Sequence, residues 1–139
     1  MSGFERFMKS NKLPRVNAFF CATQSLRDEN GDPLEWEIKP LTTREAEAIR
    51  MDCTKCVRTE NGMQTVLDGD FVARLCAAAV VYPDLKDAQL QDSYGVFTPQ
   101  DLLLELLDSP GEFNALAGFV REQSGLDISV AKLAEEAKN

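Results

Sequence analysis

Residues 34–39 alternate between apolar and polar side chains, which is typical of a strand with one buried face. Residues 28–33, just before them, read Asp-Glu-Asn-Gly-Asp-Pro and give a strong turn signal, and residues 16–26 are rich in β-branched and aromatic side chains. The pattern predicts a β-hairpin over residues 16–40, which must pack on other elements to be stable. The apolar residues expected on its buried face are Leu34, Trp36 and Ile38.

Apolar residues at the front of the chain recur every three to four positions, as in an amphipathic helix. Ser2 and Glu5 make a capping box ahead of them, and Pro14 would end the helix. The sequence therefore predicts a short N-terminal helix within residues 1–15. Its apolar stripe consists of Phe4, Phe7 and Met8.

After the hairpin the spacing becomes helical, which predicts a mostly helical body over residues 41–125. Thr42 and Glu45 form a capping box for a helix that is expected to reach about Arg58. Residues 59–69 contain two glycines and are expected to form a loop.

Further helices are expected in the second half of this body. Residues 70–82 are apolar nearly all round, which indicates a helix buried on most sides, and Pro83 would end it. A short helix is expected around residues 88–92. The other helix signals are Thr98-Pro99 as a start, Ser109-Pro110-Gly111-Glu112 as a start with a capping box, and Gly125 as an end.

The end of the chain predicts one more amphipathic helix, with Val130 and Leu133 on its apolar stripe. Together the patterns predict a single α+β domain, in which an N-terminal β-hairpin packs on a mostly α-helical body. Its expected parts are an N-terminal helix at 1–15, the hairpin at 16–40, the helical body at 41–125 and a C-terminal helix at 126–139.

Composition limits where such a domain can act. The 139 residues fit one domain, and 44% hydrophobic with 27% charged residues are ordinary values for a globular protein. No apolar run approaches the ~20 residues of a membrane span, and the first residues lack the apolar core of a signal peptide. We therefore expect a cytoplasmic protein that binds no membrane, with four cysteines present as free thiols.

The net charge of −8 is spread unevenly along the chain. Residues 1–16 hold four cations against one acid, whereas residues 59–112 hold ten acids against two cations. The acidic body would repel a phosphate backbone, and a short basic start without an aromatic platform favours a solvated helix. Nucleic acid is therefore not expected as a partner.

The reactive side chains do not indicate a catalytic site. The sequence has no histidine, which is the commonest general acid–base and a leading metal ligand. Cys53 and Cys56 fall late in a predicted helix, on its buried face, where core thiols are favoured over a zinc or redox site. We expect a protein that is not an enzyme. The less favoured alternative is an enzyme that uses a thiol or a carboxylate, with Cys53, Cys56 and Asp70 as its candidates.

The acidic clusters do not indicate a metal or cofactor site either. Asp28, Asn30 and Asp32 resemble the start of a calcium loop, but the glycine and glutamate that should follow are missing. Asp68 and Asp70 favour a loop followed by a helix cap over a pair of catalytic carboxylates. The chain has no glycine-rich phosphate-binding motif, so no cofactor is expected.

Short blocks of sequence stand in a characteristic order along nearly the whole chain. They are Trp36-Glu37-Ile38-Lys39-Pro40-Leu41-Thr42, Asp52-Cys53-Thr54-Lys55, Val80-Val81-Tyr82-Pro83-Asp84-Leu85, Leu90-Gln91-Asp92-Ser93-Tyr94-Gly95-Val96, the stretch 107–114 with Pro110-Gly111-Glu112-Phe113-Asn114, and Ala137-Lys138-Asn139. Each block alone is a weak signal, but the series is fairly specific. In this order the blocks resemble the XkdN-like phage tail assembly chaperones of tailed phages and defective prophages of Gram-positive bacteria.

The resemblance implies a non-catalytic role in the cytoplasm of the bacterial host. Such chaperones are expected to bind the long, apolar tape measure protein and keep it soluble until the tail tube protein polymerises around it. The resemblance further implies self-association around this client and absence from the mature virion. The alternative is a structural tail component or adaptor that is retained in the virion.

Contact with such a client needs an apolar stripe that the core of the chaperone does not use. The opposing interpretation, which the pattern alone favours, is that each stripe packs on its own domain. Trp36, Tyr82 and Tyr94 are expected to be core or turn residues and not docking residues. The candidate partner-binding residues are Phe4, Phe7 and Met8 at the front and Val130 and Leu133 at the back.

Overall fold

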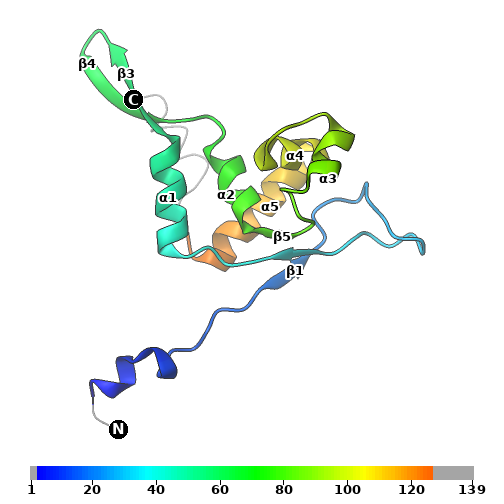
Figure 1. Cartoon of the computed structure of the whole chain (residues 1–139), viewed down its shortest axis with the longest axis horizontal. Helices are drawn as coiled ribbons and strands as arrows, with labels where there is room; N and C mark the ends of the chain where they lie inside the picture. The colour runs from blue at the N-terminus through cyan, green and yellow to red at the C-terminus, as the bar shows by residue number, and fades with distance from the viewer. Residues whose placement is uncertain (1–2, 127–139) are drawn as a thin grey trace.

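The fold combines helices with antiparallel sheets, which confirms the predicted α+β class. The computed structural model describes residues 3–126 (Figure 1). Within these residues, helices pack on one face of a short three-stranded sheet, and parts of the chain, among them its N-terminal residues, extend outward from this body. The elements in chain order are η1 (Glu5–Phe7), η2 (Lys9–Asn11), β1 (Ala18–Phe20), β2 (Trp36–Ile38), α1 (Thr43–Cys53), β3 (Thr54–Thr59), β4 (Gly62–Leu67), α2 (Phe71–Ala79), β5 (Val80–Tyr82), α3 (Ala88–Tyr94), α4 (Pro99–Leu106) and α5 (Pro110–Ser124).

The predicted N-terminal strands pair with each other and face the core. β1 runs antiparallel to β2, with Ala18 opposite Ile38 and Phe20 opposite Trp36. Trp36 and Ile38 are buried, as the alternation predicts. Leu34 lies before β2 and is exposed, so its predicted place on the buried face is wrong. The alternating pattern therefore holds only for the residues inside the strand.

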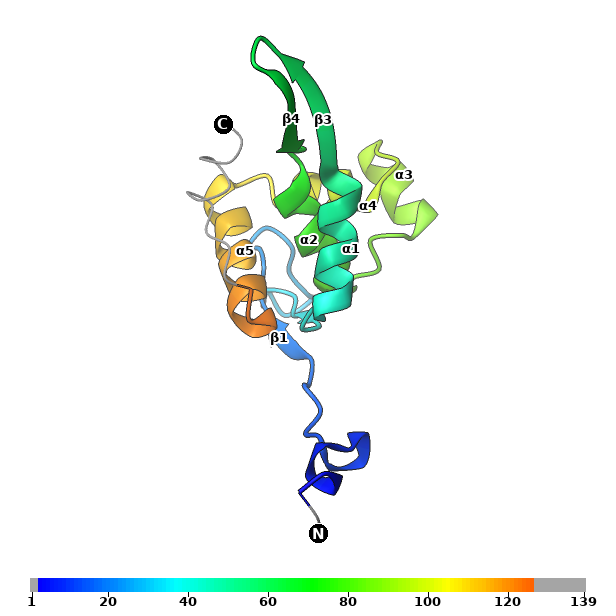
Figure 2. The same cartoon turned by 90° about the vertical axis from the view of Figure 1, so that its left-hand side faces the viewer.

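A second hairpin stands where the sequence predicts the end of a helix and a loop. α1 begins at the predicted capping box of Thr42 and Glu45 but ends at Cys53, and β3 and β4 follow. The predictions of a helix to Arg58 and of a loop over residues 59–69 are therefore wrong. β3 is rich in β-branched residues, which favour a strand over a helix. The hairpin projects beyond the body (Figure 1, Figure 2).

The predicted helix over residues 70–82 ends earlier than expected. α2 stops at Ala79, and the next residues form β5, which pairs antiparallel with β2 on the side away from β1. Two valines and a tyrosine favour this strand, and pairing with β2 satisfies their backbone groups. Asp70 occupies the N-cap position of α2, but its side chain makes no capping hydrogen bond there.

The predicted N-terminal α-helix does not form. The segment contains two 3-10 turns instead, η1 and η2, and neither turn has a buried residue. A short segment gains too little from helical hydrogen bonds to stay α-helical unless it packs on a surface. The spacing of its apolar residues is correct for an amphipathic helix, but within residues 3–126 none of the residues of these two turns is buried.

α4 begins at its predicted cap and α5 ends at its predicted glycine, whereas α3 extends the short helix predicted around residues 88–92 to Tyr94. The side chain of Asp87 accepts the Leu90 N–H at the start of α3, and Thr98 accepts the Asp101 N–H at the start of α4. Gly125 adopts a left-handed conformation, with φ 76°, and ends α5. These signals act within one turn of helix, so the sequence alone is enough to place them.

The capping box predicted at the start of α5 is not formed. Ser109 is at the N-cap position but makes no capping hydrogen bond with its side chain. The carboxylate of Glu112 instead accepts the Thr23 hydroxyl and the Gln24 backbone N–H, each at 2.8 Å. Glu112 therefore connects the chain after β1 to α5. Its charge-assisted hydrogen bond to the buried Thr23 is stronger than the capping bond it would make at the start of α5.

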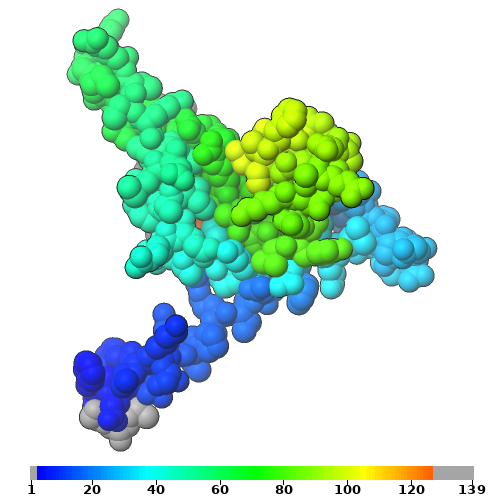
Figure 3. Space-filling view, in the orientation of Figure 1, coloured from blue at the N-terminus to red at the C-terminus, as the bar shows by residue number. Residues whose placement is uncertain are grey.

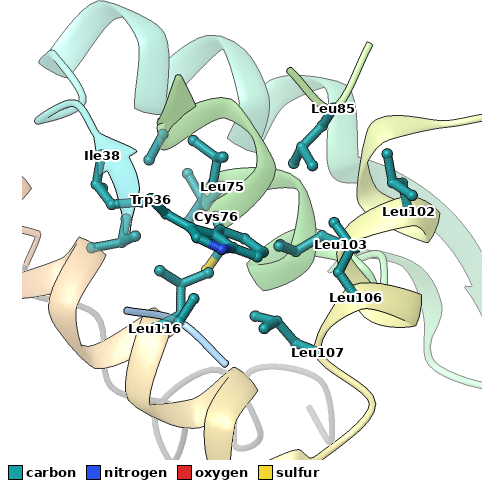
Figure 4. Packing of buried hydrophobic residues seen from close by; sticks show 14 of the residues in the cluster. Trp36, Ile38, Leu75, Cys76, Leu85, Leu102, Leu103, Leu106, Leu107 and Leu116 are labelled. Carbon is teal, nitrogen blue, oxygen red and sulfur yellow. The ribbon is translucent and has the colours of Figure 1, made fainter. Parts of the chain in front are cut away.

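Trp36 lies in the middle of the hydrophobic core (Figure 4). Side chains from α2, α4 and α5 surround its indole ring, so the sheet and the helices share one core. Within residues 3–126, no helix is long and apolar enough to cross a membrane. The core residues labelled in Figure 4 are Trp36, Ile38, Leu75, Cys76, Leu85, Leu102, Leu103, Leu106, Leu107 and Leu116.

Candidate functional site

Exposed apolar side chains gather in the N-terminal segment, which we define as residues 3–17. It extends away from the body (Figure 1) and forms a separate projection in the space-filling view (Figure 3). Phe4 and Phe7 are 81% and 89% exposed, and Met8 is 50% exposed. These three predicted partner-binding residues therefore do not pack on their own domain.

Sequence reasoning missed two further members of this apolar group. Leu13 and Val16 are 88% and 76% exposed and lie in extended chain on either side of Pro14. Helical spacing does not link them to the front stripe, so a search for periodicity could not find them. A signal was nevertheless present, because a proline ends the helical pattern while apolar residues continue.

Short-range hydrogen bonds give the segment its local shape. The Met8 N–H donates to the Glu5 carbonyl and the Lys12 N–H donates to the carbonyl of Lys9, each at 3.1 Å. The side-chain amide of Asn11 donates to the Glu5 carbonyl at 2.8 Å. Because these bonds are local, they shape the backbone without burying any of the apolar side chains.

Arg15 fixes the base of the segment to the body. Its guanidinium donates to the backbone carbonyl of Ser124 at 2.9 Å and to the carbonyl of Leu41. The buried Ser124 hydroxyl in turn accepts the Leu41 N–H at 2.8 Å. Arg15 is thus bound both by the end of α5 and by the chain before α1, so the segment leaves the body from a defined place.

Positive charges lie between the apolar residues of the segment. Arg6, Lys9 and Lys12 are all exposed. Their long side chains keep charge in water while their aliphatic parts can cover apolar surface. The segment therefore suits a partner surface that combines apolar and acidic side chains.

The other predicted candidates, Val130 and Leu133, lie outside the described residues, as does the C-terminal helix predicted over residues 126–139. The structure therefore shows the exposure of Phe4, Phe7 and Met8 alone, and partner binding by all five residues stays a prediction.

The β3–β4 hairpin is a second projection, and sequence reasoning missed it. Met63 near its tip is exposed, and Lys55 forms an ion pair with Asp68 near its base, at 2.9 Å. The Lys55 ammonium lowers the pKa of the Asp68 carboxyl. The turn signal Asn61-Gly62 between two runs rich in β-branched residues could have predicted this hairpin.

A groove of about 490 Å³ lies between α1, α2, β5 and the start of α4. Two ion pairs lie at the groove: Lys39 contacts Glu45 at 2.6 Å, and Arg74 contacts Asp70 at 2.9 Å. The Lys39 ammonium and the Thr42 N–H hold the pKa of the Glu45 carboxyl below its usual value of 4.5. This groove is balanced in charge, which gives no preference for an ionic ligand.

The thiols that could serve as nucleophiles are spread over different surroundings. Cys53 is a core residue as predicted, and burial raises the pKa of its thiol. Cys56 is exposed on β3, so its predicted place on a buried helix face is wrong. Burial also raises the pKa of the Cys76 thiol to about 12. A nucleophilic cysteine needs a lowered pKa, and these two buried thiols shift in the opposite direction.

The acidic turn of the first hairpin binds its own backbone. The Asp28 carboxylate accepts the backbone N–H groups of Asn30 and Asp32, at 2.8 and 3.0 Å. This is the geometry of an Asx-turn, which accounts for the acidic residues without a metal. Within residues 3–126, no group of three potential metal ligands comes together.

The three aromatic residues assigned to core or turns have different surroundings. Trp36 is a core residue, as predicted. Tyr82 ends β5 with most of its side chain exposed, and Tyr94 ends α3 next to the left-handed Gly95. Their positions at the ends of elements agree with the predicted turn role.

The sequence model for the phage XkdN-like tail assembly chaperone proteins matches residues 4–138. The chain belongs to this family of tail assembly chaperones. The match covers the N-terminal segment as well as the body.

Relatives of this XkdN-like chaperone come from Bacillus subtilis strain 168. Protein XkdN of the phage-like element PBSX is 25% identical over 114 residues, which cover 81% of this chain and 77% of that protein. Protein YqbN of the same strain is also 25% identical over 114 residues, with 81% and 76% covered. The crystal structure of YqbN superposes with a TM-score of 0.74 at 21% identity, covering 91% of this chain and 99% of that one. That likeness shows a shared fold.

Proposed function

We propose that this XkdN-like chaperone binds the tape measure protein of its phage and keeps that protein soluble in the bacterial cytoplasm. We further propose that it leaves before the virion is complete. The observation that carries the proposal is the exposed apolar N-terminal segment beside a body that already has its own closed core. A tail assembly chaperone, the role of the family, needs a binding surface of this kind.

The size of the apolar stripe suits reversible binding. Full burial of one large apolar side chain is worth about 1.5–3 kcal/mol, and association itself costs several kcal/mol in lost freedom of motion. Phe4, Phe7 and Met8 would therefore give a weak contact per chaperone. Many copies along one long client would act together, and the tail tube protein could still displace them one at a time.

The charge of the body supports the second half of the role. Residues 59–112 carry ten acids against two cations, and a surface of one sign keeps a coated client in solution by mutual repulsion. The same surface would repel nucleic acid. We propose that the acidic body faces water while the N-terminal segment faces the client.

The predicted C-terminal stripe supplies a second proposed contact. Val130 and Leu133 have helical spacing in the sequence, at the end of the chain opposite to the front stripe. A chaperone with apolar contacts at both ends could span neighbouring turns of a helical client.

We propose a role without catalysis. The buried thiols have raised pKa values, and Asp70 is engaged by Arg74. The variants Cys56→Ser and Asp70→Asn are accordingly expected to keep the chaperone activity of the unchanged protein, measured as the yield of soluble client. Loss of that activity in a variant that still folds would favour a chemical role instead.

Co-expression with the tape measure protein tests the proposal. The unchanged chaperone is expected to move the tape measure protein into the soluble fraction and to co-purify with it. Replacing Phe4, Phe7 and Met8 by serine should return most of the client to the pellet. The matched control is Met63→Ser, which removes an exposed apolar side chain from the β3–β4 hairpin and should leave the client soluble. A client that stays insoluble with the unchanged chaperone contradicts the proposal.

Mass spectrometry of purified virions separates a chaperone from a structural tail component. A chaperone should be absent from the particles while being present in the lysate. Detection in the virion at a fixed ratio to the tail tube protein would support the adaptor role instead.

A further inference from the structure

The outer face of α4 combines acidic and apolar side chains. Asp101, Glu105 and Asp108 are exposed, and Leu104 between them is 43% exposed. The spacing of three and four residues places Leu104 and Glu105 beside Asp101 on one side of the helix, and Asp108 follows in the chain after the C-cap Leu107. The inner side of α4, with Leu102, Leu103 and Leu106, faces the core (Figure 4). The helix therefore presents a leucine surrounded by negative charge to solvent.

Phe97 adds a larger exposed apolar side chain just before this helix. It precedes the N-cap Thr98, where an apolar residue often packs on the fourth residue of the helix. Here the fourth residue, Leu102, is fully buried while Phe97 is 88% exposed, so that packing is not made. We define the α4 face as Phe97, Asp101, Leu104, Glu105 and Asp108.

The α4 face and the N-terminal segment are complementary. Residues 84–108 hold six acids and one lysine, all exposed, whereas the N-terminal segment alternates apolar residues with Arg6, Lys9 and Lys12. Aromatic and aliphatic side chains on both sides can bury one another, and opposite charges around them set the orientation. The same pairing would not suit the groove beside β5, where the charges balance.

The two surfaces of one chain lie apart. Arg15 fixes the base of the N-terminal segment at the end of α5, and the segment leaves on the side of the body away from α3 and α4 (Figure 1, Figure 2). The space-filling view shows the segment and the α3–α4 region as separate ends of the molecule (Figure 3). A segment held in this way is directed toward another molecule.

We infer that, before a client is bound, the N-terminal segment of one copy docks on the α4 face of a second copy. The contact joins two different surfaces, so it leaves a free segment at one end and a free face at the other and can continue into chains or rings. Docking also covers apolar side chains that would otherwise promote aggregation. This inference rests on the proposed function, because the client then competes with the neighbouring copy for the segment.

Charge exchange in the full-length chain tests this contact. The unchanged protein is expected to self-associate in light scattering after gel filtration at 50 mM NaCl. Lys9→Glu with Lys12→Glu, or Asp101→Lys with Glu105→Lys, should each weaken self-association about tenfold or more, because like charges then meet. A 1:1 mixture of the two double variants should regain the association, since the segment and face of one then match the face and segment of the other.

Different results would overturn different proposals. A monomeric unchanged protein at all concentrations tested, undiminished association of either double variant, or a mixture that stays monomeric would overturn the docking of the segment on α4. The control is circular dichroism, which should be unchanged because all four substituted side chains are exposed. The face variant with Asp101→Lys and Glu105→Lys should still keep co-expressed tape measure protein soluble. If the unchanged chaperone does not bind the tape measure protein, that result would instead count against the proposed function.

Discussion

The body and the N-terminal segment use the same kinds of apolar residue for different purposes. In the body, leucines from three helices surround Trp36 and are almost completely buried. In the segment, Phe4 and Phe7 stay in solvent although their spacing would suit a buried helix face. Apolar spacing therefore shows which side chains can be buried together. Whether they are buried depends on a second surface, which the body supplies to its own helices and a partner must supply to the segment.

The largest expected effect is in the core. Trp36→Ala should lower the free energy of unfolding by about 3–5 kcal/mol, because it removes the side chain around which the sheet and helices pack. Urea denaturation followed by circular dichroism measures this loss. A loss below about 1 kcal/mol would contradict the contrast between body and segment, since the core would then not depend on its central residue.

The second largest loss of stability is expected when the hydrogen bonds between α5 and the chain after β1 are removed. Glu112→Ala removes the acceptor of the Thr23 hydroxyl and the Gln24 N–H, and should cost about 2 kcal/mol. Glu122→Ala is the matched control, because it removes an exposed glutamate from the same helix. The two variants are compared by thermal and urea denaturation. Equal losses would show that the contact of Glu112 contributes nothing specific.

The cap of α1 is expected to give a smaller loss. Thr42→Ala removes the side chain that accepts the Glu45 N–H and should cost about 1 kcal/mol in urea denaturation. Thr43 is the next residue, is also exposed and is not the N-cap residue, so Thr43→Ala should lower the free energy of unfolding much less. If both variants lose the same amount, the capping bond does not explain the loss at Thr42.

The Glu45 carboxylate should make part of this stability depend on pH. Its pKa is lowered in the folded protein by Lys39 and the Thr42 N–H, so its contribution is fully present above the usual value of 4.5. That contribution is lost as the pH falls below 4.5 and through the lower pKa of the folded state. The stability difference between the unchanged protein and Glu45→Gln should therefore shrink over this range. In a Lys39→Met background it should be smaller throughout, and a difference that grows toward acid pH would contradict the assignment.

The smallest effect is expected in the N-terminal segment. Replacing Phe7 by serine should change the free energy of unfolding by less than about 0.5 kcal/mol, because this side chain is 89% exposed. Urea denaturation next to Trp36→Ala measures the contrast directly. A loss above about 1.5 kcal/mol would mean that Phe7 packs on its own domain in solution.

The signals that could be predicted from the sequence act over short distances. Thr98 before Pro99 and Gly125 after α5 determine helix ends through bonds within one turn. The alternation of apolar and polar residues around Trp36 and Ile38 predicts a buried strand face. These features need no knowledge of the rest of the fold, so they agree with the structure.

The wrong predictions concern residues whose structure is determined by a partner far away in the sequence. Val80–Tyr82 fits a helix by pattern, but the open edge of β2 converts it into β5. Glu112 fits a capping box, but the buried Thr23 is the better partner for its carboxylate. The β3–β4 hairpin is a different case, because the sequence contains its turn signal but apolar residues at the spacing of α1 continue into β3 and favour a longer helix.

The candidate site could be predicted only in part for the same reason. Spacing identified Phe4, Phe7 and Met8 as an apolar stripe, yet the same spacing favours burial within the domain. Whether they are exposed depends on how the rest of the chain folds around them, and in residues 3–126 the three side chains are at least half exposed. Leu13 and Val16 follow no period and emerged only from the structure.

Hydrogen–deuterium exchange of the chaperone, alone and in complex with the tape measure protein, tests the contrast between segment and body most directly. The backbone of residues 3–17 makes mainly local hydrogen bonds and should exchange fast in the client-free protein at low concentration. In the complex this segment is expected to become protected, while α2 and α5 keep the exchange rates of the free chaperone. A stable complex in which residues 3–17 still exchange fast would contradict the assignment of the segment as the client-binding surface.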